Sequence, residues 1–128
     1  MNTLRRKRGH HYPKVDANYP VLVLTADGPL RGKTKHISTQ QAFVRCEDPL
    51  RLYDVASLSI EVAKNESLLV AEAEVIWSNR YGPDDEITPR GMVVRFTRLA
   101  TRERQRLQKA IVRHYKAKMK VHRGRRAR

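Results

Sequence analysis

Apolar and polar residues alternate along two stretches of the chain with the period of two that is typical of half-buried β-strands. Residues 55–63 (VASLSIEVA) set four apolar positions against three polar ones, namely Val55, Leu58, Ile60 and Val62 against Ser57, Ser59 and Glu61. Residues 67–79 (SLLVAEAEVIWSN) likewise set Ala71, Ala73, Val75 and Trp77 against Glu72, Glu74, Ile76 and Ser78. Both stretches are predicted to be strands joined by a hairpin near Asn65, with Trp77 in the core.

Four shorter segments are also predicted to be strands, the first because it is rich in β-branched and apolar residues and the second because it alternates weakly, with one face exposed to solvent. They are residues 19–25 (YPVLVLT), 31–38 (RGKTKHIS), 42–46 (AFVRC) and 91–96 (GMVVRF). The first ends at the turn signal Ala26-Asp27-Gly28, and Pro49 stops the ladder after the third. The long polar loop predicted before the last strand is RYGPDDEITPRG, which contains two prolines and two glycines.

The period changes to that of a helix in residues 101–119 (TRERQRLQKAIVRHYKAKM). Apolar positions recur there at the i, i+3, i+4 spacing of a helix face, at Leu107, Ala110, Ile111 and His114–Tyr115. Thr101 is predicted to be the N-cap, and Glu103 lies in the first turn, where the helix dipole favours an acid. The stripe from Leu107 to Ile111 is expected to dock on the sheet, and the chain is expected to fray after Met119.

Six short strands and one terminal helix predict a mainly β fold, a small antiparallel barrel or rolled sheet with the helix packed against it. The 128 residues fit one domain. No apolar run approaches the roughly 20 residues of a membrane span, and no apolar segment of a secretory signal follows the basic N-terminus. The lone Cys46 cannot form an internal disulfide, and no Cys/His set has zinc spacing. We therefore expect a cytoplasmic protein without a metal or a cofactor.

The formal net charge of +14 is concentrated at the two ends of the chain. Residues 1–14 carry five basic side chains and residues 113–128 carry eight, and neither segment contains an acid. The residues between them have a net charge of only +1. Such ends either attract a polyanion or an acidic surface, or serve as solvated tails. We expect a basic tail at residues 1–9, a domain at 10–115 and a second basic tail at 116–128.

The element order and several short motifs together resemble the PilZ family, bacterial domains that bind the second messenger cyclic di-GMP. The similarity extends from about His10 to Tyr115. It rests on HHYPKV before the YPVLV strand, HISTQQAF before an apolar strand, the VIW and GMVVRF strands and the closing helix. The resemblance implies a six-stranded antiparallel PilZ-like barrel with a C-terminal amphipathic helix, and cyclic di-GMP as the possible ligand.

The first ligand motif of the family, RxxxR, is altered in this chain. His10 and Lys14 stand at the positions of its two arginines, which in the family hold phosphates and guanine edges. Lysine keeps the charge but lacks the bidentate fork of arginine, and histidine is mostly neutral at pH 7. Arg5, Arg6 and Arg8 lie just upstream and are candidates to replace the lost contacts, although no register among them gives RxxxR.

The second ligand motif of the family, (D/N)xSxxG, keeps one of its three positions. Ser38 matches, His36 replaces the acid and Gln41 replaces the glycine; further along the chain, Gly91 is present. Each lost hydrogen bond to a charged group removes roughly 1.5–3 kcal/mol. If the losses added, the affinity of a micromolar binder would fall to about millimolar or beyond. Ser38 lies in no nucleophile motif, and its predicted role is to cap backbone N–H groups of a turn.

Three functions are consistent with these residues. The first is a signalling module with degraded ligand motifs that acts through protein contact. The second is a genuine cyclic di-GMP receptor that uses the arginines of the N-terminus together with Lys14. The third is a nucleic-acid-binding module in which the barrel carries basic ends. Arg90 and Arg95 are further candidates for an anion site, the histidines show no metal-ligand spacing, and no motif indicates an enzyme.

Overall fold

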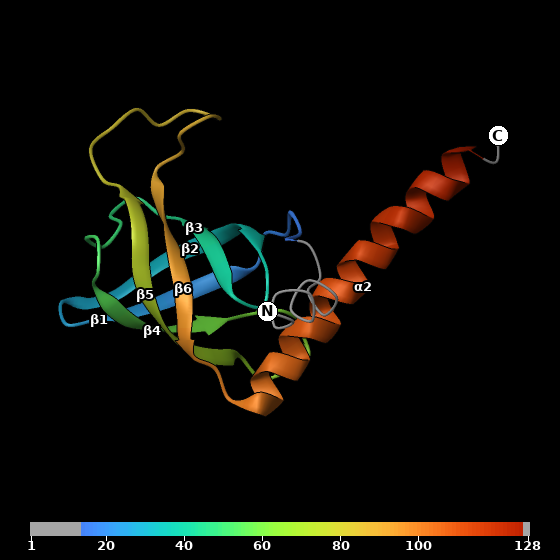
Figure 1. The fold of residues 1–128 in the computed structure, drawn as a ribbon, viewed down its shortest axis with the longest axis horizontal. Helices are drawn as coiled ribbons and strands as arrows, with labels where there is room; N and C mark the ends of the chain where they lie inside the picture. Colours follow the sequence, from blue (N-terminus) through green and yellow to red (C-terminus); the bar gives the residue numbers. More distant parts are fainter. Residues whose placement is uncertain (1–13, 127–128) are drawn as a thin grey trace, which may run out of the picture.

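Six antiparallel strands form a closed barrel in the order β1-β2-β3-β6-β5-β4, and one long helix follows them (Figure 1). The elements are β1 (Pro20–Thr25), β2 (Gly28–Ile37), β3 (Gln41–Arg45), β4 (Val55–Ile60), β5 (Leu69–Asn79), β6 (Gly91–Arg98) and α2 (Thr101–Arg126). This computed structural model describes residues 14–126. The predicted mainly β fold, its six strands and its C-terminal helix are confirmed.

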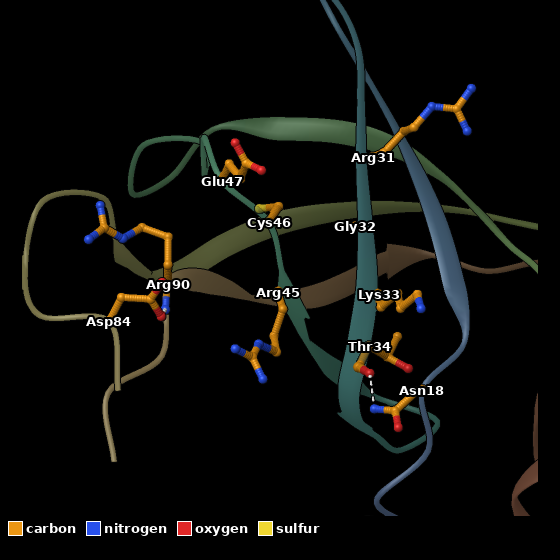
Figure 2. A pocket seen from close by; sticks show the side chains of 10 residues that line it. All are labelled: Asn18, Arg31, Gly32, Lys33, Thr34, Arg45, Cys46, Glu47, Asp84 and Arg90. Carbon is orange, nitrogen blue, oxygen red and sulfur yellow. Dashed lines mark hydrogen bonds between the residues drawn. The ribbon is translucent and has the colours of Figure 1, made fainter. Parts of the chain in front are cut away.

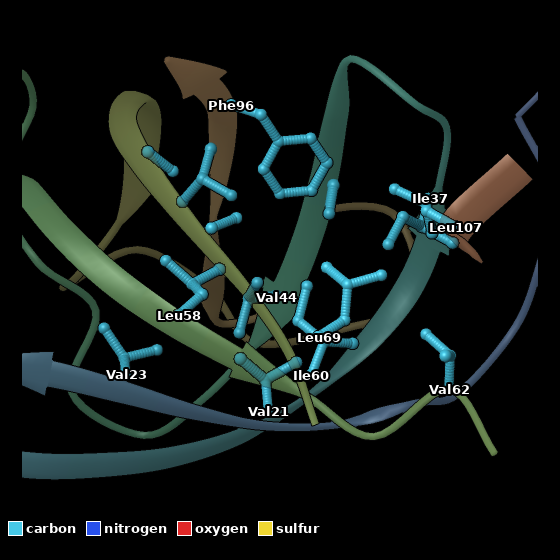
Figure 3. Close-up of a cluster of buried hydrophobic side chains, with 14 of the residues drawn as sticks. Val21, Val23, Ile37, Val44, Leu58, Ile60, Val62, Leu69, Phe96 and Leu107 are labelled. Carbon is cyan, nitrogen blue, oxygen red and sulfur yellow. The ribbon is translucent and has the colours of Figure 1, made fainter. Parts of the chain in front are cut away.

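The inward side chains of the strands fill the barrel with aliphatic residues (Figure 3). In β4 the buried positions are Ala56, Leu58 and Ile60, which alternate with half-exposed serines. Val55 was predicted to face the core, and this was wrong, since its side chain is 66% exposed. Strict alternation explains the difference, because Val55 is an odd number of residues away from the buried positions of the same strand.

Trp77 was also predicted to be buried, and its side chain is instead 41% exposed. Val75 pairs with Val94 and Trp77 pairs with Val93, so β5 has one more residue than β6 at this point. The extra residue forms a β-bulge, which breaks the alternation and turns the following side chain to the other face. Trp77 therefore lies on the outer surface of the barrel, although its parity matches that of the buried Ala71, Ala73 and Val75.

The turn predicted between the first two strands is present. Gly28 has a φ of +116°, a left-handed conformation that favours glycine. The Thr25 hydroxyl donates a hydrogen bond to the carbonyl oxygen of Gly28 at 2.7 Å and closes the turn. The sequence signal Ala26-Asp27-Gly28 thus has a direct conformational cause.

The first turns of α2 dock on the barrel through the predicted stripe. Leu107, Ala110 and Ile111 are each at most 2% exposed, and Leu107 lies close to Ile37 at one end of the core (Figure 3). Glu103 fixes this end further, because its carboxylate accepts a hydrogen bond from the Val70 N–H at 3.2 Å. The helix therefore covers an end of the barrel with its N-terminal half.

Both predicted ends of the helix differ from the observed ones. The first helical hydrogen bond runs from the Arg104 N–H to the Ala100 carbonyl oxygen, so Ala100 is the cap residue and Thr101 the first helical residue. The helix continues to Arg126 instead of fraying after Met119, because most of the added residues are strong helix formers. No helix in residues 14–126 is long and apolar enough to cross a membrane.

Candidate ligand site

The segment before β1 is fixed along β2, and this places Lys14 at the barrel surface. Val15 and Ile37 exchange two backbone hydrogen bonds of 3.0 Å. The buried Thr34 hydroxyl accepts a hydrogen bond from the Tyr19 N–H at 2.8 Å and donates one to the Ala17 carbonyl oxygen. Lys14 consequently lies near enough to His36 to influence its pKa.

Ser38 caps the turn between β2 and β3, as the sequence predicted. Its hydroxyl oxygen accepts hydrogen bonds from the N–H groups of Gln40 and Gln41, both at 3.2 Å. Its own N–H donates to the Gln41 carbonyl oxygen at 2.9 Å. Gln41 starts β3 opposite Arg95 of β6 and, unlike a glycine in a left-handed turn, has no positive φ.

An aromatic row crosses the outer face of four neighbouring strands. His36 of β2 pairs with Phe43 of β3, Phe43 pairs with Val93 of β6, and Val93 pairs with Trp77 of β5. The ring centroids of His36 and Phe43 are 5.6 Å apart, and those of Phe43 and Trp77 are 5.8 Å apart. We call His36, Phe43 and Trp77 the aromatic row; its tilted ring contacts are those that aromatic side chains prefer.

His36 is held in its neutral form by its surroundings. Partial burial lowers the pKa of the imidazole, and the positive charges of Lys14 and Lys35 lower it further, against the opposing effect of Asp16. At pH 7 the ring is therefore uncharged and cannot act as an anionic acceptor. A carboxylate at this position would be negatively charged at pH 7 and could accept hydrogen bonds at both of its oxygens.

The loop between β5 and β6 folds over the aromatic row. The buried Asn79 side-chain amide donates to the carbonyl oxygens of Pro83 and Thr88 at 2.7 and 3.0 Å, and its oxygen accepts from the Gly82 N–H at 2.9 Å. The Lys35 ammonium group donates to the Glu86 carbonyl oxygen at 3.3 Å. The loop and the strands border an open pocket of about 260 Å³ lined by Lys35, His36, Phe43, Trp77, Ile87, Pro89 and Val93.

A larger pocket of about 640 Å³ lies on the same outer face (Figure 2). Lys33 and Arg45 pair directly across β2 and β3, and Arg31 is two residues further along β2. Like charges at directly opposed positions are unfavourable, so this arrangement suits a bound anion. Glu47 and Asp84 also line the pocket and offset part of its charge.

The two arginines proposed from sequence for an anion site are already occupied. The Arg90 guanidinium donates to the carbonyl oxygens of Arg80 and Gly82, both at 2.7 Å, and so holds the loop. Arg95 forms an ion pair with Glu74 at 2.7 Å. Arg90 lines the larger pocket, but its fork is bound to the backbone.

Of the candidate ligand residues from the sequence, the structure places Lys14, His36, Ser38 and Gln41 on or beside the β2–β3 hairpin. Arg5, Arg6, Arg8 and His10 lie outside the described residues. Gly91 is buried at the start of β6, where a Cβ would lie 2.4 Å from the Val44 carbonyl oxygen. This close approach of two strands explains why a glycine stands at position 91. Gly91 lines neither of the two pockets described above.

Sequence reasoning missed Phe43 and the Lys33–Arg45 pair as parts of the site. Both depend on the register of β2 against β3, which shifts at a bulge between Thr34 and His36. The sequence does contain a signal for the loop at Asn79, because an Asn followed closely by Gly82 and Pro83 is typical of a turn. Within residues 14–126, no three His, Cys, Asp or Glu side chains form a group that could hold a metal ion.

A comparison with known protein families identifies the family to which this chain belongs. Residues 5–113 match the PilZ domain family. The chain belongs to the PilZ family. Its fold is that of a cyclic di-GMP-binding family, and the resemblance found in the motifs and element order is confirmed. No curated protein matches the sequence significantly.

Solved PilZ structures share the fold at low sequence identity. The Bacillus subtilis inhibitor of motility (MotI/DgrA) has a TM-score of 0.69 at 21% identity, with 85% of this chain and 51% of that chain covered. This PilZ chain thus spans about half the length of the Bacillus protein. The PilZ domain of Escherichia coli YcgR, solved with c-di-GMP, has a TM-score of 0.64 at 14% identity, with 88% and 95% covered.

A third PilZ structure extends the comparison. The PilZ domain of CeSA from a cellulose-synthesizing bacterium has a TM-score of 0.53 at 20% identity and covers 84% of this chain and 99% of that one. At these identities the similarity establishes the barrel and its helix. What this chain binds has to be argued from its own residues.

Proposed function

We propose that this PilZ domain is a non-catalytic regulatory module with a weakened cyclic di-GMP site, and that it acts through contact with a protein partner. The observation that carries the proposal is the state of His36. It stands where the family motif has an acid, packs against Phe43 at 5.6 Å and has a lowered pKa. A neutral imidazole in a ring contact cannot accept two guanine N–H bonds as a carboxylate does.

The surroundings of the site favour a protein as the partner. Trp77 is 41% exposed, and Tyr81 and Ile87 of the adjoining loop are 83% and 90% exposed. Ile76, next to Trp77, is also exposed. A cluster of large apolar side chains beside a family ligand site is a feature of protein interaction surfaces. Tryptophan and tyrosine are also the residue types most enriched among interface hot spots.

The ligand part of the proposal is tested by titrating the full chain with cyclic di-GMP at low salt, using calorimetry and amide chemical shifts. We expect a dissociation constant of about a millimolar or weaker. Low-micromolar binding by the unmodified protein would overturn this part of the proposal.

A restored motif provides the matched comparison. The triple variant Lys14→Arg, His36→Asp and Gln41→Gly is expected to bind cyclic di-GMP at least tenfold more tightly, because the fork and the carboxylate return. The triple variant that carries His36→Leu in place of His36→Asp has no acceptor at this position and is expected to gain less. Equal affinities for the two triple variants would contradict the role assigned to position 36.

A second candidate function rests on the Lys33–Arg45 pair. Two opposed cations that line a pocket of about 640 Å³ suit a phosphate-bearing ligand, so the domain would be a cyclic di-GMP receptor assisted by Arg5, Arg6, Arg8 and Lys14. In that case the unmodified protein binds at micromolar concentration. Changing the three N-terminal arginines to alanine would abolish this binding, and no effect of that change would reject the route.

A further inference from the structure

A row of basic residues follows α2 at regular helical spacing. Arg102, Arg106, Lys109, Arg113 and Lys116 succeed one another at intervals of four, three, four and three. The same intervals continue in the sequence at Lys120 and Arg123. Positions three and four apart share one side of a helix, so we call the five residues from Arg102 to Lys116 the basic stripe. With a rise of about 1.5 Å per residue, this stripe is roughly 20 Å long.

The stripe lies largely opposite the docked side of α2. Leu107, Ala110 and Ile111 face the barrel and are buried, whereas Arg102, Lys109, Arg113 and Lys116 are exposed. Arg106 is the exception, since it forms an ion pair with Glu103 at 2.8 Å and another with Glu66 at 3.6 Å. Within the described part of the chain, the four exposed members form no ion pair.

The part of α2 that follows Glu103 contains no acidic residue. Glu103 is the last acid in the sequence, and residues 104–128 contain eleven basic side chains. The C-terminal half of α2 extends past the barrel, away from the acids of the strands and loops (Figure 1). Apart from Arg106, the stripe is therefore a linear array of positive charge that is not neutralised by acids of its own helix.

A linear array of this kind complements a linear polyanion. Duplex nucleic acid carries one negative charge per roughly 1.7 Å of its axis, and its major groove, about 12 Å wide, admits an α-helix. A membrane-surface helix needs an apolar face to insert. On α2 the barrel covers Leu107, Ala110 and Ile111, and among the described side chains beyond them only Tyr115 and Met119 are large, apolar and exposed. So small an apolar surface favours a duplex over a lipid surface.

We propose that the basic stripe of α2 binds duplex nucleic acid through its phosphates, independently of base sequence. The side chains on the stripe are lysines and arginines, which neutralise phosphates and release counterions. The barrel then holds the helix by its N-terminal half and leaves the stripe free for the duplex. This property is separate from cyclic di-GMP binding, because the stripe and the aromatic row involve different residues.

Fluorescence anisotropy with a labelled 20-base-pair DNA duplex tests the proposal on the full chain between 50 and 200 mM salt. For the unmodified protein, the logarithm of the affinity is expected to fall with the logarithm of the salt concentration with a slope of about −4 or steeper. The test variant replaces the four exposed stripe residues with glutamine, as R102Q, K109Q, R113Q and K116Q. Its slope is expected to be flatter by about 3 to 4, and its affinity at 100 mM salt lower on the order of a hundredfold.

A control variant removes the same charge from the barrel, as R51Q, K64Q, R95Q and R98Q, all of which are exposed positions outside the two pockets described above. It is expected to keep most of the affinity and slope. An equal loss in both variants would overturn the proposal, because charge alone and not the stripe would then be responsible. Absence of duplex binding at 50 mM salt would overturn it too, as would equally tight binding to polyglutamate or to phosphatidylserine vesicles. Circular dichroism of both variants checks that α2 remains helical.

Discussion

His36 and Cys46 are titratable residues whose surroundings keep them uncharged at neutral pH. For His36, burial and two nearby lysines lower the pKa. For Cys46, burial raises the pKa to about 11, with a smaller contribution from the charge of Asp48. The first effect removes an acceptor from the ligand site. The second makes the single thiol of the chain inert, because the thiolate is the reactive form.

The thiol makes the stability of the domain depend on alkaline pH. The folded pKa of Cys46 is about 11 and its ordinary value is 9.0, so the unfolded chain loses the proton first as the pH rises. The contribution is complete below pH 9 and is lost between pH 9 and 11, on the order of 2 kcal/mol. Urea denaturation at pH 8 and 10.5 measures the loss. The Cys46→Ala variant should lose less over this range, and an equal loss would contradict the assignment.

The elements differ in how strictly they follow their own periodicity. β4 alternates without interruption, whereas the bulge in β5 turns Trp77 outward and so completes the aromatic row. The helix keeps its period throughout, but the barrel covers only the stretch that contains Leu107 and Ile111. The bulge and the limited docking of the helix therefore decide which side chains are available for binding.

Trp77 reports the bulge directly, because it is the only tryptophan of the chain. We expect its fluorescence to be red-shifted and readily quenched by acrylamide, as for a partly exposed indole. Trp77→Ala is expected to lower the free energy of unfolding by less than the roughly 3–5 kcal/mol of a fully buried aromatic residue. Blue-shifted emission that resists quenching would show that Trp77 lies in the core after all.

Substitutions at the two ends of α2 should differ in their effect on stability. Leu107 is fully buried, so Leu107→Ala is expected to lower the free energy of unfolding by about 2–5 kcal/mol. Met119→Ala is the matched control, since Met119 is 43% exposed and lies beyond the docked turns; its effect should stay within about 0.5 kcal/mol. Chemical denaturation measures both. Similar losses would mean that the helix packs along its whole length.

Charge is unevenly distributed over the whole molecule, since a nearly neutral barrel lies between two strongly basic ends of the chain. Twelve of the thirteen acids lie between Asp16 and Glu86, and eight basic residues lie in 113–128. Among residues 101–119, whose side chains the structure describes, the last buried side chain of α2 is Ile111, so the helix continues well past the docked stretch. The domain boundary expected at residue 115 lies within α2 and stays a prediction.

Truncation after Tyr115 tests that boundary. Because the buried residues of the barrel and of the docked helix all precede it, the shortened chain is expected to unfold at a temperature within a few degrees of that of the full chain. Thermal unfolding followed by circular dichroism measures this. A collapse of the transition would place residues 116–126 within the cooperative unit.

Local sequence pattern determined much of this protein: six strands, the loop before β6, the amphipathic helix and the stripe that docks it, together with the motifs of a PilZ domain. These features depend on residues close together in the chain, whose periodicity and turn chemistry act locally. Ser38 capping its turn is of the same kind, because all its partners lie within three residues.

Tertiary structure alone decided which side chains meet across strands. The opposition of Lys33 and Arg45, the contact of Phe43 with Trp77 and the pairing of β3 with β6 join residues far apart in sequence. A bulge changes the face of every later residue in a strand, and no local pattern marks its position. For this reason the fold and the capping of the β2–β3 turn by Ser38 could be predicted from the sequence, while the outward position of Trp77 and the cationic pocket followed only from the register of the closed barrel.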